Sequence, residues 1–259
     1  MKVNTMAEMM ASGTTPEVLF WVGCAGSFDQ RAQKITKAFA TILDKAGVNY
    51  AILGKEEACT GDPARRAGNE FMFQMMAYQN IQILNGYSIK KIVTTCPHCF
   101  NVLKNEYPVL GGNYEVIHHT QFLQELIENG KIKFTDTNEW KGKSITYHDS
   151  CYLGRANEIY EAPRKVLESL DMELREMKRC KSKGLCCGAG GAQMFKEEEK
   201  GDKRVNMERA EEAIETKSDF VASACPFCNT MLTDGIKNRN EEINTEVLDI
   251  AEMIAKAIQ

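Results

Sequence analysis

The sequence predicts an α/β protein of two pseudo-symmetric halves, each a small, mainly parallel sheet with flanking helices and with cysteines at the carboxyl ends of its strands. Short apolar runs typical of buried strands alternate with longer amphipathic stretches typical of helices. Strict alternation of this kind indicates parallel strands joined by helical crossovers. In addition, nine of the ten cysteines fall into two series with nearly the same spacing.

The two cysteine series define the repeat. The first is Cys24, Cys59, Cys96 and Cys99, and the second is Cys151, Cys186, Cys187, Cys225 and Cys228. Offsets between partners hardly change, since 151 − 24 is 127, 187 − 59 is 128 and 225 − 96 is 129. Each series ends in a CxxC motif, Cys-Pro-His-Cys in the first and Cys-Pro-Phe-Cys in the second. A repeat of this length predicts a duplicated domain.

We expect three segments along the chain. Residues 1–16 form an N-terminal arm or short helix, 17–139 a first cysteine-rich domain and 140–259 a second. The boundary near 139 lies in the polar stretch 131–143, and two domains of roughly 125 residues each are of ordinary size.

The elements of the first half follow from apolar runs and capping residues. Strands are expected at 18–22, 48–53, 91–95 and 114–118, and helices at 30–46, 69–85 and 120–129. A short helix follows the first CxxC motif. Gly47 is a helix stop, and Asp62 followed by Pro63 is expected to cap another helix.

The second half repeats this order. Strands are expected at 144–148, 172–177, 219–223 and 245–248, with helices at 158–170, 203–217 and the C-terminus. Ligand crevices of parallel α/β sheets lie beyond the carboxyl ends of the strands. Because each half places its cysteines after successive strands, we expect the thiols of each half to converge at one sheet edge.

Composition and charge narrow the class of protein. A net charge of −4 with scattered Lys and Arg argues against nucleic-acid binding. The N-terminus lacks the pattern of a secretory signal, and no apolar run reaches the roughly 20 residues that span a bilayer. We therefore expect a cytoplasmic protein, or one peripheral to a membrane complex. Reduced thiols in that compartment favour metal or redox sites over structural disulfides.

Three kinds of site compete for the cysteines. A CxxC motif between a strand and a helix is typical of a thioredoxin-like dithiol, but such a site has no need for the other thiols. Four thiolates in the first half suit structural zinc. The adjacent thiols of Cys186 and Cys187 suit a multi-iron cluster better than one tetrahedral ion. The glycines at 188, 190 and 191 let the backbone approach such a cluster closely.

The second series resembles the motif of the CCG, or cysteine-rich, domain proteins. The resemblance of the chain to this family covers residues 18–250. That family includes the B and D subunits of heterodisulfide reductase and the iron–sulfur subunits of lactate-utilisation and anaerobic glycerol-3-phosphate dehydrogenase systems. The resemblance implies that Cys151, Cys186, Cys187, Cys225 and Cys228 bind a catalytic noncubane [4Fe–4S] cluster. In the first half, Ala58-Cys59 stands where the paired cysteines would be, followed by Thr60 and Gly61. Only four ligands remain there, which favours a cubane [4Fe–4S] cluster or zinc.

The resemblance also implies a function. We expect an oxidoreductase subunit of the heterodisulfide reductase type, which passes electrons from a partner to an acceptor such as a disulfide. The chain lacks the C-x2-C-x2-C-x3-C-P run of ferredoxin modules, so the donor is expected to be a separate ferredoxin-like or flavin subunit. Two alternatives are a zinc-stabilised binding or scaffold module, and a subunit of a lactate or glycerol-3-phosphate oxidising complex.

A few further residues have ordinary interpretations beside functional ones. Cys180 lies outside both series and is expected to be a surface or packing thiol. His148 precedes Cys151 and could tune a cluster or donate a proton, or form an ordinary hydrogen bond at a strand end. His98 is replaced by Phe227 in the other motif, so it is not expected to be a required ligand. His118 and His119 are matched to Leu248 and Asp249 and are given no functional role.

Overall fold

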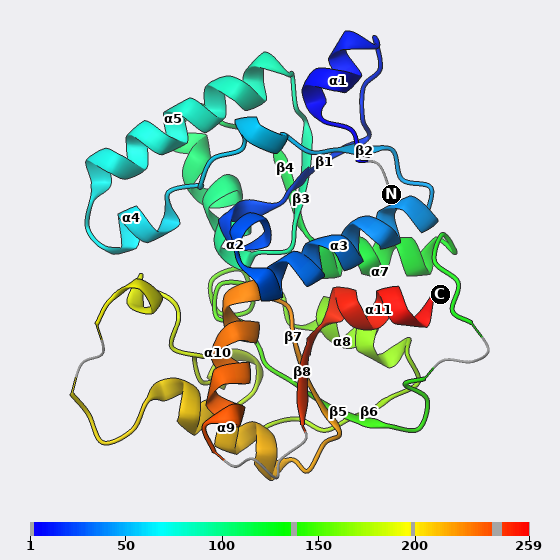
Figure 1. The fold of residues 1–259 in the computed structure, drawn as a ribbon, viewed down its shortest axis with the longest axis vertical. Helices are drawn as coiled ribbons and strands as arrows, with labels where there is room; N and C mark the ends of the chain where they lie inside the picture. Colours follow the sequence, from blue (N-terminus) through cyan, green and yellow to red (C-terminus); the bar gives the residue numbers. More distant parts are fainter. Residues whose placement is uncertain (1–2, 136–138, 198–199, 240–244, 259) are drawn as a thin grey trace. The chain divides into compact units, whose positions relative to one another are not determined.

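The computed structural model describes residues 3–135, 139–197, 200–239 and 245–258 (Figure 1). The chain divides into two compact units, Met1–Ile132 and Lys133–Gln259. Each unit contains one four-stranded sheet in which every neighbouring pair is parallel. The predicted fold class, two similar α/β halves with parallel sheets, is therefore confirmed.

The sheet of the first unit has the strand order β2-β1-β3-β4. Its strands are β1 (Val18–Trp21), β2 (Tyr50–Ala51), β3 (Lys91–Thr94) and β4 (Glu115–His118). The central strands are apolar and buried on both faces, as expected for a parallel sheet covered by helices. The first strand of the chain is thus an inner strand, and every following strand is reached by a crossover.

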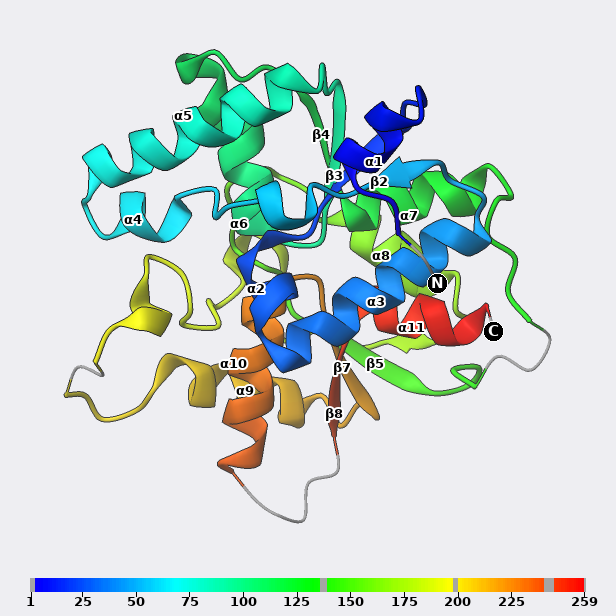
Figure 2. The ribbon, with the colours of Figure 1, turned by 45° about the horizontal axis from the view of Figure 1, so that its top comes forward.

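Helices cover both faces of this sheet, with α5 on one side and α3 and α7 on the other (Figures 1 and 2). On α3, Asp29 caps the N-terminus by accepting from Ala32 N at 2.7 Å. Phe39 on its buried face packs edge-on against Phe20 of β1, with ring centroids 5.1 Å apart. The helices of the unit are α1 (Met6–Ala11), α2 (Gly23–Phe28), α3 (Gln30–Lys45), α4 (Asp62–Arg66), α5 (Glu70–Gly86), α6 (Pro97–Asn101) and α7 (His119–Glu128), with the shorter turns η1 (Gly54–Glu56), η2 (Val102–Glu106) and η3 (Tyr107–Leu110).

The second unit repeats the topology with the order β6-β5-β7-β8. Its strands are β5 (Ser144–Tyr147), β6 (Glu173–Leu174), β7 (Phe220–Ser223) and β8 (Glu246–Asp249). Helices α9 and α10 pack so closely at Gly235 that a Cβ there would lie 2.7 Å from the carbonyl oxygen of Asn206, so only glycine fits. The helices and turns of the unit are α8 (Glu161–Glu168), α9 (Val205–Glu215), α10 (Pro226–Lys237), α11 (Ile250–Ala257), η4 (Lys181–Lys183) and η5 (Gln193–Phe195).

The helix starts after β4 and β8 correct one detail of the predicted repeat. His118 and Asp249 each end a strand, cap the following helix and take part in a capping box. His118 therefore corresponds to Asp249, and the expected match of His118 with Leu248 is wrong by one residue. Both side chains stabilise the helix start in the same way, so His118 has a structural role.

Two other expectations about local structure need correction. The strands predicted at 48–53 and 172–177 contain only two paired residues each, β2 (Tyr50–Ala51) and β6 (Glu173–Leu174). Next to β2, Ile52 forms a single parallel bridge with Thr5. Asp62 does not cap α4. Gly61 does, with φ +91°, and Asp62 is the first helical residue, which leaves its carboxylate available for other contacts.

The segment before β5 provides a test of domain independence. Thr135 donates from its N–H and its hydroxyl to the carbonyl oxygen of Ala257, both at 3.1 Å, and Trp140 Nε1 donates to Met253 O at 3.0 Å. The boundary near 139 and the arm at 1–16 remain predictions about which parts fold independently.

Expressed alone, the fragment 133–259 should unfold cooperatively in urea, followed by circular dichroism. The fragment 140–259 keeps Trp140 but loses the Thr135 bonds, so we expect it to be less stable by about 1 kcal/mol. A broad, non-cooperative transition for 133–259 would contradict the independence of the second unit.

Candidate metal centres

In the first unit, each cysteine of the series follows a strand. Cys24 lies in the first turn of α2 after β1, and Cys59 lies in the loop after β2. Cys96 caps α6 after β3, and Cys99 lies in the first turn of that helix. Parallel strands end at the same edge of a sheet, so this placement gathers residues that are up to 75 positions apart (99 − 24).

The second unit places its cysteines in the same way. Cys151 follows β5, Cys186 and Cys187 lie in the long loop after β6, and Cys225 caps α10 after β7, with Cys228 in its first turn. In both units a proline follows the capping cysteine, where its missing N–H costs nothing.

The five thiols of the second unit form one connected group. The sulfurs of Cys187 and Cys228 are 3.3 Å apart. Cys186 contacts both Cys151 and Cys187, and Cys228 contacts Cys225. Cys187, Cys225 and Cys228 are at most 2% exposed. All ten cysteines of the chain lie in its described part, and none of them forms a disulfide.

The crowding of these thiols opposes their ionisation. Hydrogen bonds from Cys151 and Cys187, with one from the Gly188 N–H, lower the pKa of Cys186. The hydrogen bond with Cys186, together with burial, raises the pKa of Cys151, and contacts with Cys187 and Cys225 raise that of Cys228 well above its usual value. One thiolate is thus favoured at the expense of its neighbours, and the others need a bound cation to ionise.

The loop around the adjacent cysteines depends on a glycine. Gly188 has φ +91°, and its N–H donates to the Cys186 sulfur at 3.3 Å. A side chain at this position would be strained in that conformation and would contact Val205. The glycine therefore lets the backbone donate a hydrogen bond at the thiol group, as predicted for this loop.

The first unit brings Cys24, Cys59 and Cys99 into electrostatic contact. A hydrogen bond from Cys24 lowers the pKa of Cys59 to about 7, with help from the N–H of Gly61 at 3.4 Å from its sulfur. Bonding to Cys59 and burial raise the pKa of Cys24. Cys96 is buried and lies three residues before Cys99 at the start of the same helix.

Hydrogen bonds reveal which residue replaces the fifth thiol in the first unit. The glycine two residues after Cys59 has φ +91° and donates to its sulfur, as Gly188 does to Cys186. Thr60 is 1% exposed, and its hydroxyl donates to Cys99 Sγ at 3.9 Å. The corresponding contact in the second unit is the one between Cys187 and Cys228. Cys59 therefore corresponds to Cys186 and Thr60 to Cys187. The expected match of Cys59 with Cys187, and of Ala58-Cys59 with the cysteine pair, is wrong by one residue.

Polar side chains fix the ligand-bearing loops of the first unit. Glu57 accepts from the N–H groups of Val22 and Gly23, at 3.0 and 2.5 Å, and so holds the start of the helix that carries Cys24. Burial raises the pKa of Glu57 to about 7, against the effect of these two bonds. The Asp62 carboxylate pairs with His98 Nδ1 at 3.0 Å. Burial acts to raise the pKa of Asp62, but the contact with His98 outweighs it and the pKa is lowered. His98 thus has a structural partner, which agrees with its absence from the predicted ligands.

In the second unit a buried arginine fixes the loop that carries Cys151. Both terminal nitrogens of Arg164 donate to the Asp149 carboxylate at 2.9 Å, and its Nε donates to Glu176 at 2.6 Å. Asp149 also accepts from the N–H of Lys181 at 2.6 Å. These contacts join α8, the Cys151 loop and the loop before Cys186.

A second buried arginine contacts His148 at the end of β5. Arg209 of α9 is fully buried, and its Nε donates to His148 Nδ1 at 2.9 Å. Burial and the positive charge of Arg209 lower the pKa of His148 to about 3. No pattern in the sequence singles out Arg164 or Arg209, since a lone arginine within a helix is usually exposed.

The donor set fits a soft metal ion or an iron–sulfur cluster. Thiolates in this number are typical of zinc and of iron–sulfur clusters. The residues that would hold such a group are Cys24, Cys59, Cys96 and Cys99 in the first unit and Cys151, Cys186, Cys187, Cys225 and Cys228 in the second. Cys180 is partly exposed, and its pKa is raised by burial and by Glu176 and Asp149, not by another thiol.

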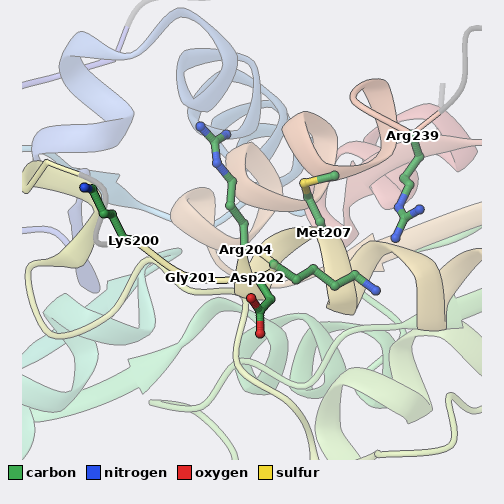
Figure 3. A pocket seen from close by; sticks show the side chains of 7 residues that line it. Lys200, Gly201, Asp202, Arg204, Met207 and Arg239 are labelled. Carbon is green, nitrogen blue, oxygen red and sulfur yellow. The ribbon is translucent and has the colours of Figure 1, made fainter.

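A pocket of about 740 Å³ has no cysteine among its lining residues, which are Lys200, Gly201, Asp202, Lys203, Arg204, Met207 and Arg239 (Figure 3). Lys203 and Arg239 both pair with Glu211, and Arg204 lies 3.9 Å from Asp234. Three of the four cations in its lining thus already have a carboxylate partner, which disfavours an anion site.

The fold and the two thiol groups define a protein with two copies of a cysteine-rich α/β domain. A model of the CCG family, described as a cysteine-rich domain, matches residues 18–104 and 145–233. The chain belongs to this family, and the resemblance seen in the sequence is confirmed.

Curated relatives carry names from redox biology. The chain is 45% identical over 258 residues to a probable iron-sulfur-binding oxidoreductase, FadF, of Bacillus subtilis, covering 99% of this chain and 36% of the relative. It is 43% identical to an EtfAB:quinone oxidoreductase of Syntrophomonas wolfei, with 99% and 36% covered. It is 37% identical to the D subunit of the dihydromethanophenazine:CoB–CoM heterodisulfide reductase of Methanosarcina barkeri, with 93% and 59% covered.

The chain spans only 36–59% of the length of these relatives. Their activities as whole proteins therefore do not transfer directly to it. Among the residues described, no helix is long and apolar enough to cross a bilayer.

The arginine network at Cys151 leads to a stability prediction. Arg164→Met leaves the buried Asp149 carboxylate without its cation, which should lower the free energy of unfolding by about 3–5 kcal/mol in urea titrations. Arg175→Met is the matched control, because its pair with Glu173 is exposed and screened by solvent, so its loss should change the stability much less. Equal losses in the two variants would show that the buried pair is not a principal support.

Proposed function

We propose that this chain is the iron–sulfur electron-transfer and catalytic part of an oxidoreductase, with its chemistry at the five-thiol group of the second unit. The observation that carries the proposal is the connected set of five mostly buried thiols, with two from adjacent residues and none in a disulfide. One tetrahedral ion does not need a fifth thiolate, whereas a cluster with several irons does.

The proposed ligands are the residues predicted from the sequence. Cys151, Cys186, Cys187, Cys225 and Cys228 would hold a noncubane [4Fe–4S] cluster, and Cys24, Cys59, Cys96 and Cys99 a cubane [4Fe–4S] cluster or zinc. When bound, the cluster supplies reversible one-electron transfer. The chain itself supplies thiolate ligands, three of them buried, and a backbone N–H at Cys186, and these features influence the reduction potential.

The proposed acceptor is a disulfide. Its reduction takes two electrons and two protons, breaks one S–S bond and yields two thiols, so two one-electron steps are needed per turnover. The name of the heterodisulfide reductase relative supports this acceptor, and the name of the EtfAB:quinone oxidoreductase supports a quinone instead. We propose a separate ferredoxin-like or flavin subunit as the electron donor.

A zinc-stabilised scaffold is the second candidate. The first unit favours it locally, because its four thiols are the number that a closed structural zinc site requires. With zinc in the second unit as well, the chain would be a binding or scaffold module without redox activity of its own.

Metal analysis separates these proposals. The chain should be purified without oxygen, and its iron, acid-labile sulfide and zinc measured per chain. We expect iron and sulfide in nearly equal amounts. About two zinc ions per chain with no sulfide would exclude the iron–sulfur proposal for both units.

Removing the thiol of Cys187 should affect the second unit alone. Cys187→Ser should abolish the paramagnetic signal of the second cluster and leave the metal content of the first unit unchanged. The measurement is electron paramagnetic resonance together with iron per chain. Simultaneous loss of metal from both units would contradict two independent sites.

Thr60 allows the opposite change. Thr60→Cys should add a fifth ligand in the first unit, because its side chain already contacts Cys99 as Cys187 contacts Cys228. If the first unit then holds the same kind of cluster as the second, the number of spins per chain in the paramagnetic signal of that cluster should rise up to twofold. Thr60→Ser keeps the hydroxyl and should leave the spectrum unchanged. An unchanged spectrum in Thr60→Cys, with the metal retained, would show that the fifth thiol does not decide the cluster type.

A further inference from the structure

A histidine lies among the thiols of the second unit. One ring nitrogen of His148 and the sulfurs of Cys187 and Cys228 all lie within 4.8 Å of one another, and all three residues are buried. Taken by itself, this arrangement suggests a sixth metal ligand. The other contact of the ring decides between a ligand and a hydrogen-bond donor.

Arg209 fixes the position of the proton on the ring. A guanidinium group has donors only and stays protonated in proteins, so the Arg209 Nε–H at 2.9 Å requires a lone pair on His148 Nδ1. The proton of the imidazole is therefore on Nε2, and Nε2 has no lone pair to give to a metal.

Arg209 is itself held by contacts of Nε and Nη1, while its Nη2 is buried without a hydrogen-bond partner among the described residues. Its Nη1 donates to the carbonyl oxygen of Arg179 at 2.8 Å and to Glu212 at 2.9 Å, and its side chain is 0% exposed. A rearrangement that released Nδ1 would leave this buried cation with fewer partners. The ring is thus fixed in orientation as well as in protonation.

The Nε2–H group needs an acceptor. Within the described part of the chain, His148 Nε2 is buried and has no hydrogen-bond partner. A buried N–H without a partner is costly and rare. A bound cluster would bring thiolate and sulfide sulfurs, both hydrogen-bond acceptors, to the place where the ring meets Cys187 and Cys228.

We infer that His148 is an N–H donor to the sulfur of the second-unit cluster, at or beside Cys187 and Cys228, and that this bond raises the reduction potential of the cluster. The inference rests on the proposed function of the second unit. Reduction adds negative charge to the sulfurs, so a fixed donor stabilises the reduced form more than the oxidised form.

The first unit holds a comparable donor at the equivalent position. The cysteine offset relates His148 to Trp21, since 148 − 127 is 21, and sheet register agrees. Trp21 pairs with Thr94 at the end of β3, and His148 is the next residue after Tyr147, which pairs with Ala222. Trp21 Nε1 is likewise buried without a partner among the described residues, and an indole nitrogen can only donate.

The test combines two variants with a control. His148→Leu removes the donor and should lower the midpoint potential of the second cluster. We expect the equilibrium constant for its one-electron reduction to fall about tenfold, which is a shift of about 59 mV. His148→Gln offers an amide N–H and should recover part of this shift. Trp21→Phe should leave the potential of the second cluster unchanged. Redox titration followed by paramagnetic resonance measures all three.

The unchanged chain gives an independent readout. Nitrogen-15 NMR of its histidine side chains, in the metal-free and zinc-loaded forms, should show His148 protonated on Nε2 and unprotonated on Nδ1. The NMR measurement does not need a bound cluster. It therefore tests the protonation of His148 even if metal analysis shows no iron or sulfide, and a failure of the proposed function can be told from a failure of this inference.

Three results would overturn the inference. The first is an unchanged potential in His148→Leu with the cluster intact. The second is a large nitrogen hyperfine coupling in the reduced protein that disappears in this variant, which would make His148 a ligand. The third is an NMR spectrum with the proton on Nδ1.

Discussion

Thiols that lie within hydrogen-bonding distance cannot all become thiolates unless positive charge enters among them. This constraint governs both units of the chain. In the second unit, Cys186 is stabilised as a thiolate chiefly because Cys151 and Cys187 remain protonated and donate to it. Metal binding reverses this competition, since every ligand can then ionise at once, and protons are released as the site fills. The free energy of loading therefore contributes directly to holding the loops after the strands in place.

Much of the fold and of the candidate site follows from the sequence because parallel strands end at one edge. Apolar runs located the inner strands, and cysteines just after those runs were bound to converge. The lengths of β2 and β6 were overestimated, because apolar residues beyond the paired ones still pack in the core, as Val48 and Leu53 do beside β2. The match of Thr60 with Cys187 was missed for another reason. The offsets near 127 vary by a residue or two, and the register is fixed by the hydrogen bonds that the N–H groups of Gly61 and Gly188 donate to Cys59 and Cys186.

The two units use different chemistry to support similar geometry. A buried Asp62–His98 pair stands beside the first thiol group, whereas the second is flanked by the fully buried cation of Arg209 and by Arg164 with its two carboxylates. These supports could not be read from the sequence, because no motif marks an arginine that is buried by contacts from another element.

Thr60 places a hydroxyl where the second unit has the thiol of Cys187, and this difference affects how the metal-free protein is oxidised by air. Cys187 and Cys228, 3.3 Å apart, need little movement to form a disulfide, and that bond would remove two ligands from the second unit at once. The hydroxyl of Thr60 cannot form such a bond with Cys99. This particular oxidation therefore has no counterpart at the Thr60–Cys99 contact of the first unit, where the hydrogen-bonded thiols are those of Cys24 and Cys59.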